Sequence, residues 1–316
     1  MAELSISGVH TDQYVPGVSI AERQTDFIWD MLFPMIPVKK DGGKVPHWRK
    51  EDWYRNRLEP KKSGKRAPII SPILDDDLTY KTTTYHGRVP LDPDVLSNAD
   101  SELALEDSLG AYADEMRMQH AENLVATAAF SSGVWTTDTD QSGLGAARLW
   151  SASTNTAVAD ILSDIFTVRG LIGRMPNTMV FGVEAWYEGV LSNPVLISHF
   201  FGGGAQGPKI ITPQMFIQAF PGIQRVLIGM SMTTTTKDGQ TTITYSDVWG
   251  KHMLTAYVAP TPSLLTPSAG YTFAWRDRSR KWTDEGTECE FIQPEVAFDA
   301  KVTAADAGAF RYNLVS

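Results

Sequence analysis

The stretch at residues 101–130, SELALEDSLGAYADEMRMQHAENLVATAAF, is the best helix candidate in the chain. No proline interrupts it, Ser101 is a suitable N-cap, and acidic residues in the first turns suit the positive end of the helix dipole. Its apolar residues fall on one stripe at spacings of three, four and eight: Leu105, Leu109, Tyr112, Met116 and Leu124. Thirty residues at 1.5 Å each would span about 45 Å. The stretch therefore predicts a long helix that is supported along one side only.

A basic segment lies upstream of this helix, and its central part reads KVPHWRKEDWYRNRLEPKKSGKRAP from Lys44 to Pro68. Residues 39–68 hold eleven Lys or Arg and four acids, which gives a local charge of +7. Because the whole chain carries −9, the remainder carries −16. Such an asymmetry indicates contact with something outside the segment's own core: nucleic acid, a membrane surface or an acidic protein.

The flanks of the basic segment predict a long hairpin. Residues 78–89, LTYKTTTYHGRV, are rich in Thr, Tyr and Val and would form its returning strand. A polar loop of this length is uncommon inside a compact domain and is usually functional or disordered. The charge then reverses, since residues 75–115 contain eleven acids against Lys81 and Arg88. The basic segment thus has a candidate acidic partner in the same chain.

The rest of the chain alternates helical and strand-like patterns. Residues 156–175 predict an amphipathic helix, and residues 178–182, TMVFG, predict a short buried strand. Thr212 followed by Pro213 is a typical helix start, and residues 271–316 are mostly strand-like with turns between. These patterns predict a compact α/β unit followed by closing strands.

The composition is that of a globular protein, with 42% apolar and 21% charged residues. The single cysteine, Cys289, excludes an internal disulfide and a multi-cysteine metal site, and we interpret it as a small buried hydrophobe. No apolar run approaches the ~18 residues of a membrane span, and the N-terminal sequence lacks the pattern of a signal peptide. We therefore expect a soluble protein kept in a reducing compartment.

No motif predicts catalysis. The six histidines form no metal-binding pair at helical spacing, and no G-x-S-x-G occurs. The glycine run at 200–209, FFGGGAQGPK, lacks the Gly-Lys-Ser/Thr of a phosphate-binding loop and reads as a turn. Residues 138–143, DTDQSG, resemble the start of a calcium loop, but Leu149 stands where the bidentate Glu should be. We expect no enzymatic activity, no cofactor and no metal site.

The basic segment allows two interpretations. Trp48, Trp53 and Tyr54 among the cations would suit single-stranded nucleic acid. However, four acids are interleaved with the cations, and the strongly acidic remainder of the chain would repel DNA. The sequence favours a protein–protein role.

Several segments, taken in order, resemble the major capsid protein of tailed bacteriophages, which has the Hong Kong 97-type fold. The similar segments are FPMIPVKKDGGKVPHWRKEDWYR (33–55), SNADSELALEDSLGAYADEMRMQHAENLVATAAFSSGVW (97–135), MPNTMVFGVEAWYEGVLSNPVLISHF (175–200), GPKIITPQMFIQAFPGIQRVLIG (207–229), DVWGKHMLTAYVAP (247–260) and PSAGYTFAWR (267–276). The resemblance implies an α+β fold with these parts: an N-terminal arm (1–38), an extended loop (39–82), a peripheral domain (83–150) with a spine helix (101–130), an axial domain (151–284) and closing strands of the peripheral domain (285–316).

The resemblance also implies a function. The chain would be a structural subunit that assembles with itself into hexamers and pentamers of an icosahedral shell around the double-stranded DNA genome of a phage. It would be made in the cytoplasm of a bacterial host and would reside in the virion capsid, with no membrane contact. Partners would include a separate scaffolding protein, a portal and a decoration protein, and the packaged DNA would be held without specific binding.

Within this picture the extended loop packs on a neighbouring subunit. The expected contact residues are Trp48, Arg49, Lys50, Trp53, Tyr54, Arg55, Arg57, Lys61, Lys62, Lys65 and Arg66. The candidate acidic partners are Asp75, Asp76, Asp77, Glu102, Glu106 and Asp107. Two alternatives remain: an encapsulin-like nanocompartment shell on the same fold, and a nucleic-acid-binding protein that uses residues 39–68.

Overall fold

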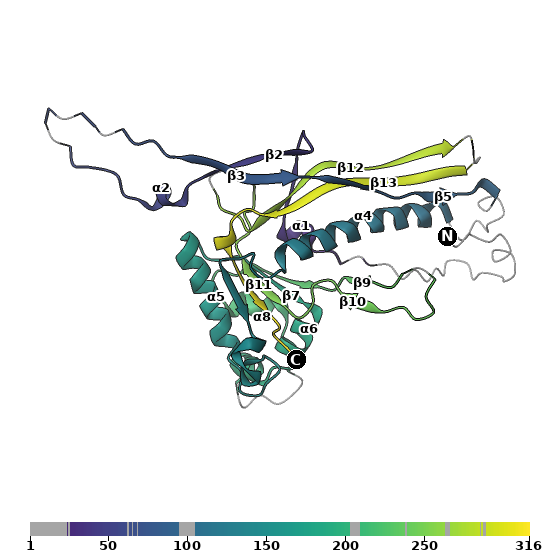
Figure 1. Cartoon of the computed structure of the whole chain (residues 1–316). Helices are drawn as coiled ribbons and strands as arrows, with labels where there is room; N and C mark the ends of the chain where they lie inside the picture. The colour runs from purple at the N-terminus through teal and green to yellow at the C-terminus, as the bar shows by residue number, and fades with distance from the viewer. Residues whose placement is uncertain are drawn as a thin grey trace.

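The computed structural model describes residues 24, 26–61, 63, 64, 66, 67, 69–94, 105–202, 209–237, 239–262, 266–284, 286 and 289–316. Figure 1 shows three parts: a long sheet with a long helix along it, a compact unit of sheet and helices below, and a hairpin that projects far to one side. None of the helices in these residues is long and apolar enough to cross a membrane.

The long sheet is built on two strands that pair over almost their whole length, β12 (Gly270–Asp284) and β13 (Cys289–Val302). The sheet order is β1-β12-β13-β4, and β5 also pairs with β13. The three shorter strands are β1 (Met35–Pro37), β4 (Thr83–His86) and β5 (Val89–Leu91). Cys289 is partly buried at the start of β13 rather than in the core.

The predicted long helix is α4 (Leu105–Ala129), which packs along β13 (Figure 1). The predicted cap, Ser101, lies outside the described residues. The predicted buried stripe is wrong in part, because Tyr112 is 56% exposed and Met116 38%. The buried residues are mainly small ones: Ala113, Ala121, Val125, Ala126 and Ala129. Small side chains let the helix approach the sheet closely, so the large ones are left at its sides.

The compact unit contains a second sheet, in the order β6-β14-β11-β7-β8. Its strands are β6 (Thr137–Asp140), β7 (Thr178–Gly182), β8 (Arg225–Gly229), β11 (Met253–Ala256) and β14 (Gly308–Tyr312). The helices around it are α5 (Ala157–Ile172), α6 (Val183–Trp186), α7 (Pro194–Phe201) and α8 (Pro213–Ala219). The predictions of α5, β7 and the start of α8 are confirmed.

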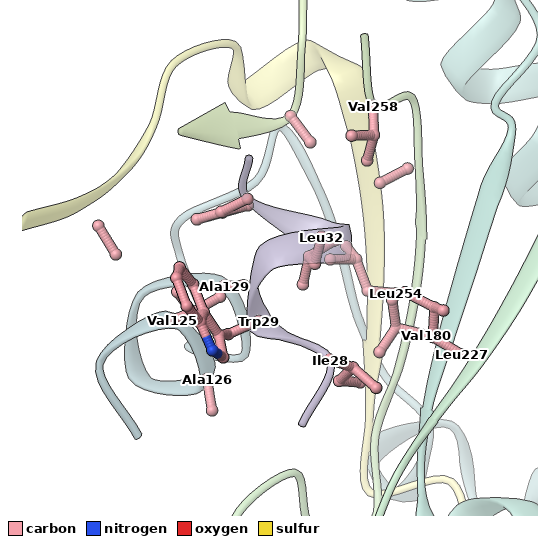
Figure 2. Packing of buried hydrophobic residues seen from close by; sticks show 14 of the residues in the cluster. Ile28, Trp29, Leu32, Val125, Ala126, Ala129, Val180, Leu227, Leu254 and Val258 are labelled. Atoms are coloured by element: carbon pink, nitrogen blue, oxygen red, sulfur yellow. The ribbon is translucent and has the colours of Figure 1, made fainter. Parts of the chain in front are cut away.

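Two smaller elements, a short helix and a two-stranded ribbon, lie close to the long helix α4. The short helix α1 (Trp29–Leu32) lies between the end of α4 and strands of the compact unit, with Ile28, Trp29 and Leu32 in one continuous core (Figure 2). A narrow ribbon of β9 (Met232–Thr234) and β10 (Tyr245–Asp247) runs beneath α4 (Figure 1).

The predicted hairpin is formed by β2 (Gly42–Trp48) and β3 (Leu74–Lys81), which pair antiparallel. The short helix α2 (Lys50–Tyr54) follows β2, and the described residues from 55 to 73 contain no further helix or strand. The division into arm, loop and domains stays a prediction. Two strands cross its predicted boundaries. β12 starts at residue 270, inside the predicted axial domain (151–284), but belongs to the long sheet. β14 lies among the predicted closing strands of the peripheral domain (285–316) but belongs to the compact sheet.

Candidate assembly surface

The projecting hairpin exposes large apolar side chains. Leu58 is 84% exposed, Ile69 94%, and Trp53 and Tyr54 61% each. Ile70, Ile73 and Leu74 are also largely exposed. Figure 1 shows that the hairpin beyond α2 projects well away from the long sheet and the compact unit, so these described parts do not cover the side chains on that portion of the hairpin. Exposed apolar groups gathered on one segment are typical of a protein–protein contact.

The cations and acids near the base of the hairpin pair with one another. Arg49 Nε donates to Asp75 Oδ2 at 2.6 Å, and Lys44 Nζ donates to Asp76 Oδ2 at 2.7 Å. The hydrogen bond from Arg49 lowers the pKa of the Asp75 carboxyl. His47 Nδ1 lies 3.5 Å from Asp77 Oδ1. Such exposed pairs are screened by water and contribute little to stability, so they set the shape of the hairpin more than its stability.

The base of the hairpin is tied to the compact unit. Lys50 Nζ donates to Asp306 Oδ2 at 2.5 Å, and Tyr54 Oη donates to the carbonyl oxygen of Ile172. An open groove of about 1050 Å³ lies between the two, lined mainly by apolar and aromatic side chains that include Trp48 and Trp53. These two contacts therefore fix the direction in which the hairpin projects from the compact unit.

The predicted contact residues fall into three groups. Trp48, Arg49, Lys50, Trp53 and Tyr54 gather at the base and on α2. Arg57 bonds Asp52, Arg55 lies 3.9 Å from Glu51, and Lys61 and Arg66 are exposed. Lys62 and Lys65 lie outside the described residues.

The predicted acidic partners are also divided. Asp75, Asp76 and Asp77 lie on β3 beside cations of their own chain, and Asp107 is exposed on α4. Glu102 lies outside the described residues, and the Glu106 side chain is not among those described. Contact of any of these residues with a second subunit stays a prediction.

Sequence reasoning missed a buried carboxylate that joins three distant segments. Glu122 of α4 is fully buried, and its Oε2 accepts hydrogen bonds from the backbone N–H groups of Ile28 (3.0 Å) and Trp29 (2.9 Å). Its Oε1 accepts from Ser231 Oγ (3.1 Å) and Trp249 Nε1 (2.6 Å). Burial raises the pKa of Glu122. The signal in the sequence was an acid at helical spacing from Val125 and Ala126, on the face that faces the core.

A second missed cluster lies inside the compact unit. Arg311 of β14 donates to both oxygens of Asp164 on α5, at 2.6 and 2.8 Å, and to Gln141 Oε1 at 3.1 Å. Asp160, one turn earlier, accepts from Gln141 and Trp150. The signal was a pair of acids four residues apart within the apolar face of a predicted helix. This cluster fixes α5 on the sheet.

Asp164 gives a testable pH dependence. Burial raises its pKa to about 6 from the ordinary 3.8, because the attraction of Arg311 only partly offsets desolvation. The folded state thus holds a proton that the unfolded chain has released. The associated stability is present below pH 3.8 and is lost as the pH rises through about 6. Between pH 4 and pH 7 the free energy of unfolding of the wild type should fall by on the order of 1–3 kcal/mol because of this group, and Asp164→Asn should lack that fall. Denaturant unfolding across this pH range measures both proteins. An identical pH dependence in both proteins would contradict this assignment.

The residues that resemble a calcium loop have other partners. Asp140 accepts hydrogen bonds from Ser142 and Asn313, and Asp138 accepts one from the Gly133 N–H. Within the described ranges no group of three His, Cys, Asp or Glu could hold a metal ion. Most of the glycine run, residues 203–208, lies outside those ranges.

Comparison with solved structures identifies the fold. The fold matches that of a phage-related protein from Bordetella bronchiseptica RB50, with a TM-score of 0.71, 19% identity, and 92% of this chain and 93% of that one covered. The capsid structure of the cyanophage P-SCSP1u matches with a TM-score of 0.59 and 11% identity, over 98% of this chain and 95% of that one. The chain therefore has the α+β fold of phage capsid proteins, the Hong Kong 97-type fold that its sequence predicts.

Comparison of the amino-acid sequence alone also finds a phage capsid protein. The chain is 27% identical to the major capsid protein of the Burkholderia phage BcepMu over 319 residues, 94% of each chain. No protein-family model matches. The predicted resemblance to the major capsid proteins of phages is confirmed, and it extends over nearly the whole chain.

Proposed function

We propose that this chain is the structural subunit of a phage shell, which assembles with itself into hexamers and pentamers around double-stranded DNA. The hairpin is the observation that carries the proposal, because its Leu58 and Ile69 side chains are 84% and 94% exposed and its far end projects away from the rest of the chain (Figure 1). A second subunit is the partner that the capsid fold provides. The role is structural rather than enzymatic, and the place of action is the virion capsid.

The energetics favour apolar contact over ion pairs. Burial of one Leu or Ile side chain contributes about 1.5–3 kcal/mol, whereas an exposed ion pair contributes about 0–1 kcal/mol. Leu58, Ile69 and Ile70 would therefore supply most of the affinity of the loop. The surrounding cations, such as Lys61 and Arg66, would set its register on an acidic neighbour.

The double variant Leu58→Ser with Ile69→Ser tests this directly. Both side chains are exposed, so the melting temperature of the unassembled protein should change by no more than about 2 °C. The critical concentration for assembly, measured by light scattering, should rise about tenfold or more. Ser71→Ala, an exposed change in the same loop, is the matched control and should assemble normally. Normal assembly of the double variant would exclude a contact role for these apolar residues.

The proposal extends to the rest of the predicted architecture. Residues 1–38 would act as an arm, the long sheet with α4 as a peripheral domain, and the compact unit as an axial domain that points to the centre of each ring. A scaffolding protein, a portal and a decoration protein would be partners in the phage. Synthesis in the cytoplasm of a bacterial host follows from that biology.

Two rival functions use the same features. An encapsulin-like shell would share the fold, but similarity to a phage major capsid protein over 94% of the chain favours the phage. A nucleic-acid-binding role would need residues 39–68 to bind phosphates. Deletion of the exposed loop would then abolish DNA binding in a mobility-shift assay and leave self-association unchanged, the reverse of what a shell subunit should do.

A further inference from the structure

The ribbon of β9 and β10 beneath α4 is a sheet of two short strands (Figure 1). Its three residue pairs are Met232 with Asp247, Thr233 with Ser246, and Thr234 with Tyr245. A two-stranded ribbon of this size is only marginally stable in water, and each of its outer edges offers backbone groups to a further strand. A segment that pairs with one of these edges would therefore stabilise the ribbon.

The outer edge of β9, on the side away from β10, carries the backbone groups of Met232 and Thr234. The Val248 N–H donates to the Ser231 carbonyl oxygen at 3.0 Å, so Ser231 points toward β10. Alternate residues of an antiparallel strand point to opposite neighbours, so Met232 and Thr234 face the outer edge. At Met232 this edge is occupied, because its N–H donates to Gln24 Oε1 and its carbonyl accepts from Gln24 Nε2, both at 3.0 Å.

Gln24 thus fills the place of a strand partner at the start of β9. Its side-chain amide offers a donor and an acceptor, as a strand backbone does. Its backbone N–H donates to Glu115 Oε1 of α4 at 2.7 Å, and Gln119 Nε2 donates to the Met232 carbonyl at 3.1 Å. Residue 24 is therefore fixed between α4 and β9, at the edge that Thr234 continues.

The contacts after Gln24 give the direction of the chain along this edge. The Ile28 N–H donates to Glu122, and the same carboxylate accepts from the Ser231 hydroxyl. From residue 24 to residue 28 the chain thus runs toward the beginning of β9. The residues before Gln24 leave in the opposite sense, past Thr234, which is antiparallel to β9.

The sequence before Gln24 has the alternation of a strand, VSIAERQ at 18–24. In an antiparallel register with residue 24 opposite Met232, Val18 and Ile20 lie on the face of the ribbon that carries Met232 and Tyr245. Those two side chains are 45% and 62% exposed. Because a shift of one residue would move Val18 and Ile20 to the other face, apolar contact selects this register.

We propose that residues 18–23 of the same chain add a third strand to the outer edge of β9, antiparallel to it, with Glu22 opposite Thr234. The tether at Gln24 favours this occupant over a second copy, since a short tether gives an effective concentration on the order of millimolar. The inference goes beyond the proposed function, because the strand would form in a single chain before any assembly. Residues 1–17 would then be the part of the predicted arm that reaches a neighbour.

Hydrogen exchange of the backbone amides at residues 232–236, followed by mass spectrometry on the full chain, tests the added strand. The double variant Ser19→Pro with Ile20→Pro removes two adjacent N–H groups, so the donor that faces β9 is lost in any register. Exchange at 232–236 should become about tenfold faster or more. Ser5→Pro with Ile6→Pro makes the same replacements outside 18–23 and should leave the rate unchanged. The amides of β11 should stay protected in all three proteins, which shows that the body remains folded.

Three results would overturn the inference. The first is equal exchange at 232–236 in the wild type and in the Ser19→Pro, Ile20→Pro variant. The second is equal acceleration in the Ser5→Pro, Ile6→Pro control. The third is protection that disappears when the wild type is diluted until it no longer assembles, which would assign the edge to a second copy. Protection in a chain that never assembles would support the added strand while the proposed function fails, so the two claims are tested separately.

Discussion

Replacement of Glu122 by alanine should lower the free energy of unfolding by about 3–5 kcal/mol. Four donors lose their acceptor together: the backbone N–H groups of Ile28 and Trp29, the Ser231 hydroxyl and the Trp249 indole. A buried donor without a partner costs about 1–3 kcal/mol, and partial entry of water recovers some of the sum. Denaturant unfolding of the unassembled protein measures this loss.

Glu122→Gln keeps the size of the side chain, removes its charge and halves its number of acceptor oxygens. The amide keeps one acceptor oxygen, but its NH₂ group must face one of the two donor pairs, so about 1–3 kcal/mol should still be lost. Because burial raises the pKa of Glu122, the free energy of unfolding has a protonation-linked component that is present below the pKa of the unfolded chain and is lost as the pH rises through the raised pKa. The Gln variant should lack this component. A Glu122→Ala protein as stable as the wild type would show that the carboxylate does not hold the segment of Ile28 and Trp29 in place.

Replacement of Arg311 by methionine should cost about 3–5 kcal/mol, because it leaves the carboxylate of Asp164 buried without its partner. Asp164 would take up a proton at neutral pH, and its pKa would rise further above the present value of about 6. Arg311→Lys keeps the charge but loses the two-pronged geometry, so we expect an intermediate loss. Thermal unfolding should rank the stabilities as wild type, then Arg311→Lys, then Arg311→Met.

The double variant Arg311→Met with Asp164→Leu serves as the control. Well-packed apolar residues often replace a buried ion pair at little cost, so much of the lost stability should return. Equal losses in the single and double variants would show that the methionine damages packing rather than pairing.

Some features were predictable because they depend on local sequence. The hairpin of β2 and β3 follows from two strand-like segments around a polar loop, and α4 follows from a long run without proline. The buried side of α4 was predicted poorly. Large apolar residues such as Tyr112 and Met116 suggested the stripe, but close approach to β13 selects alanines instead.

Other features depend on contacts between distant segments. Glu122 bonds Ile28 and Trp249, which lie 94 and 127 residues away in the chain, and no local pattern links these positions. The pairing of β14 with β6 and β11 is of the same kind. The cations of 39–68 are evident from the sequence by their charge, whereas Leu58 and Ile69 become informative only once the structure shows that the described part of the chain leaves them exposed.

Assembly of this chain with itself can be measured from the mass of the purified full chain. We would express the chain, measure its mass by light scattering and image it by negative-stain electron microscopy. We expect rings of five or six subunits or closed shells, with masses far above the 34.8 kDa of one chain. A particle that stays at the mass of one chain, even when the neighbouring phage genes are co-expressed, would contradict it.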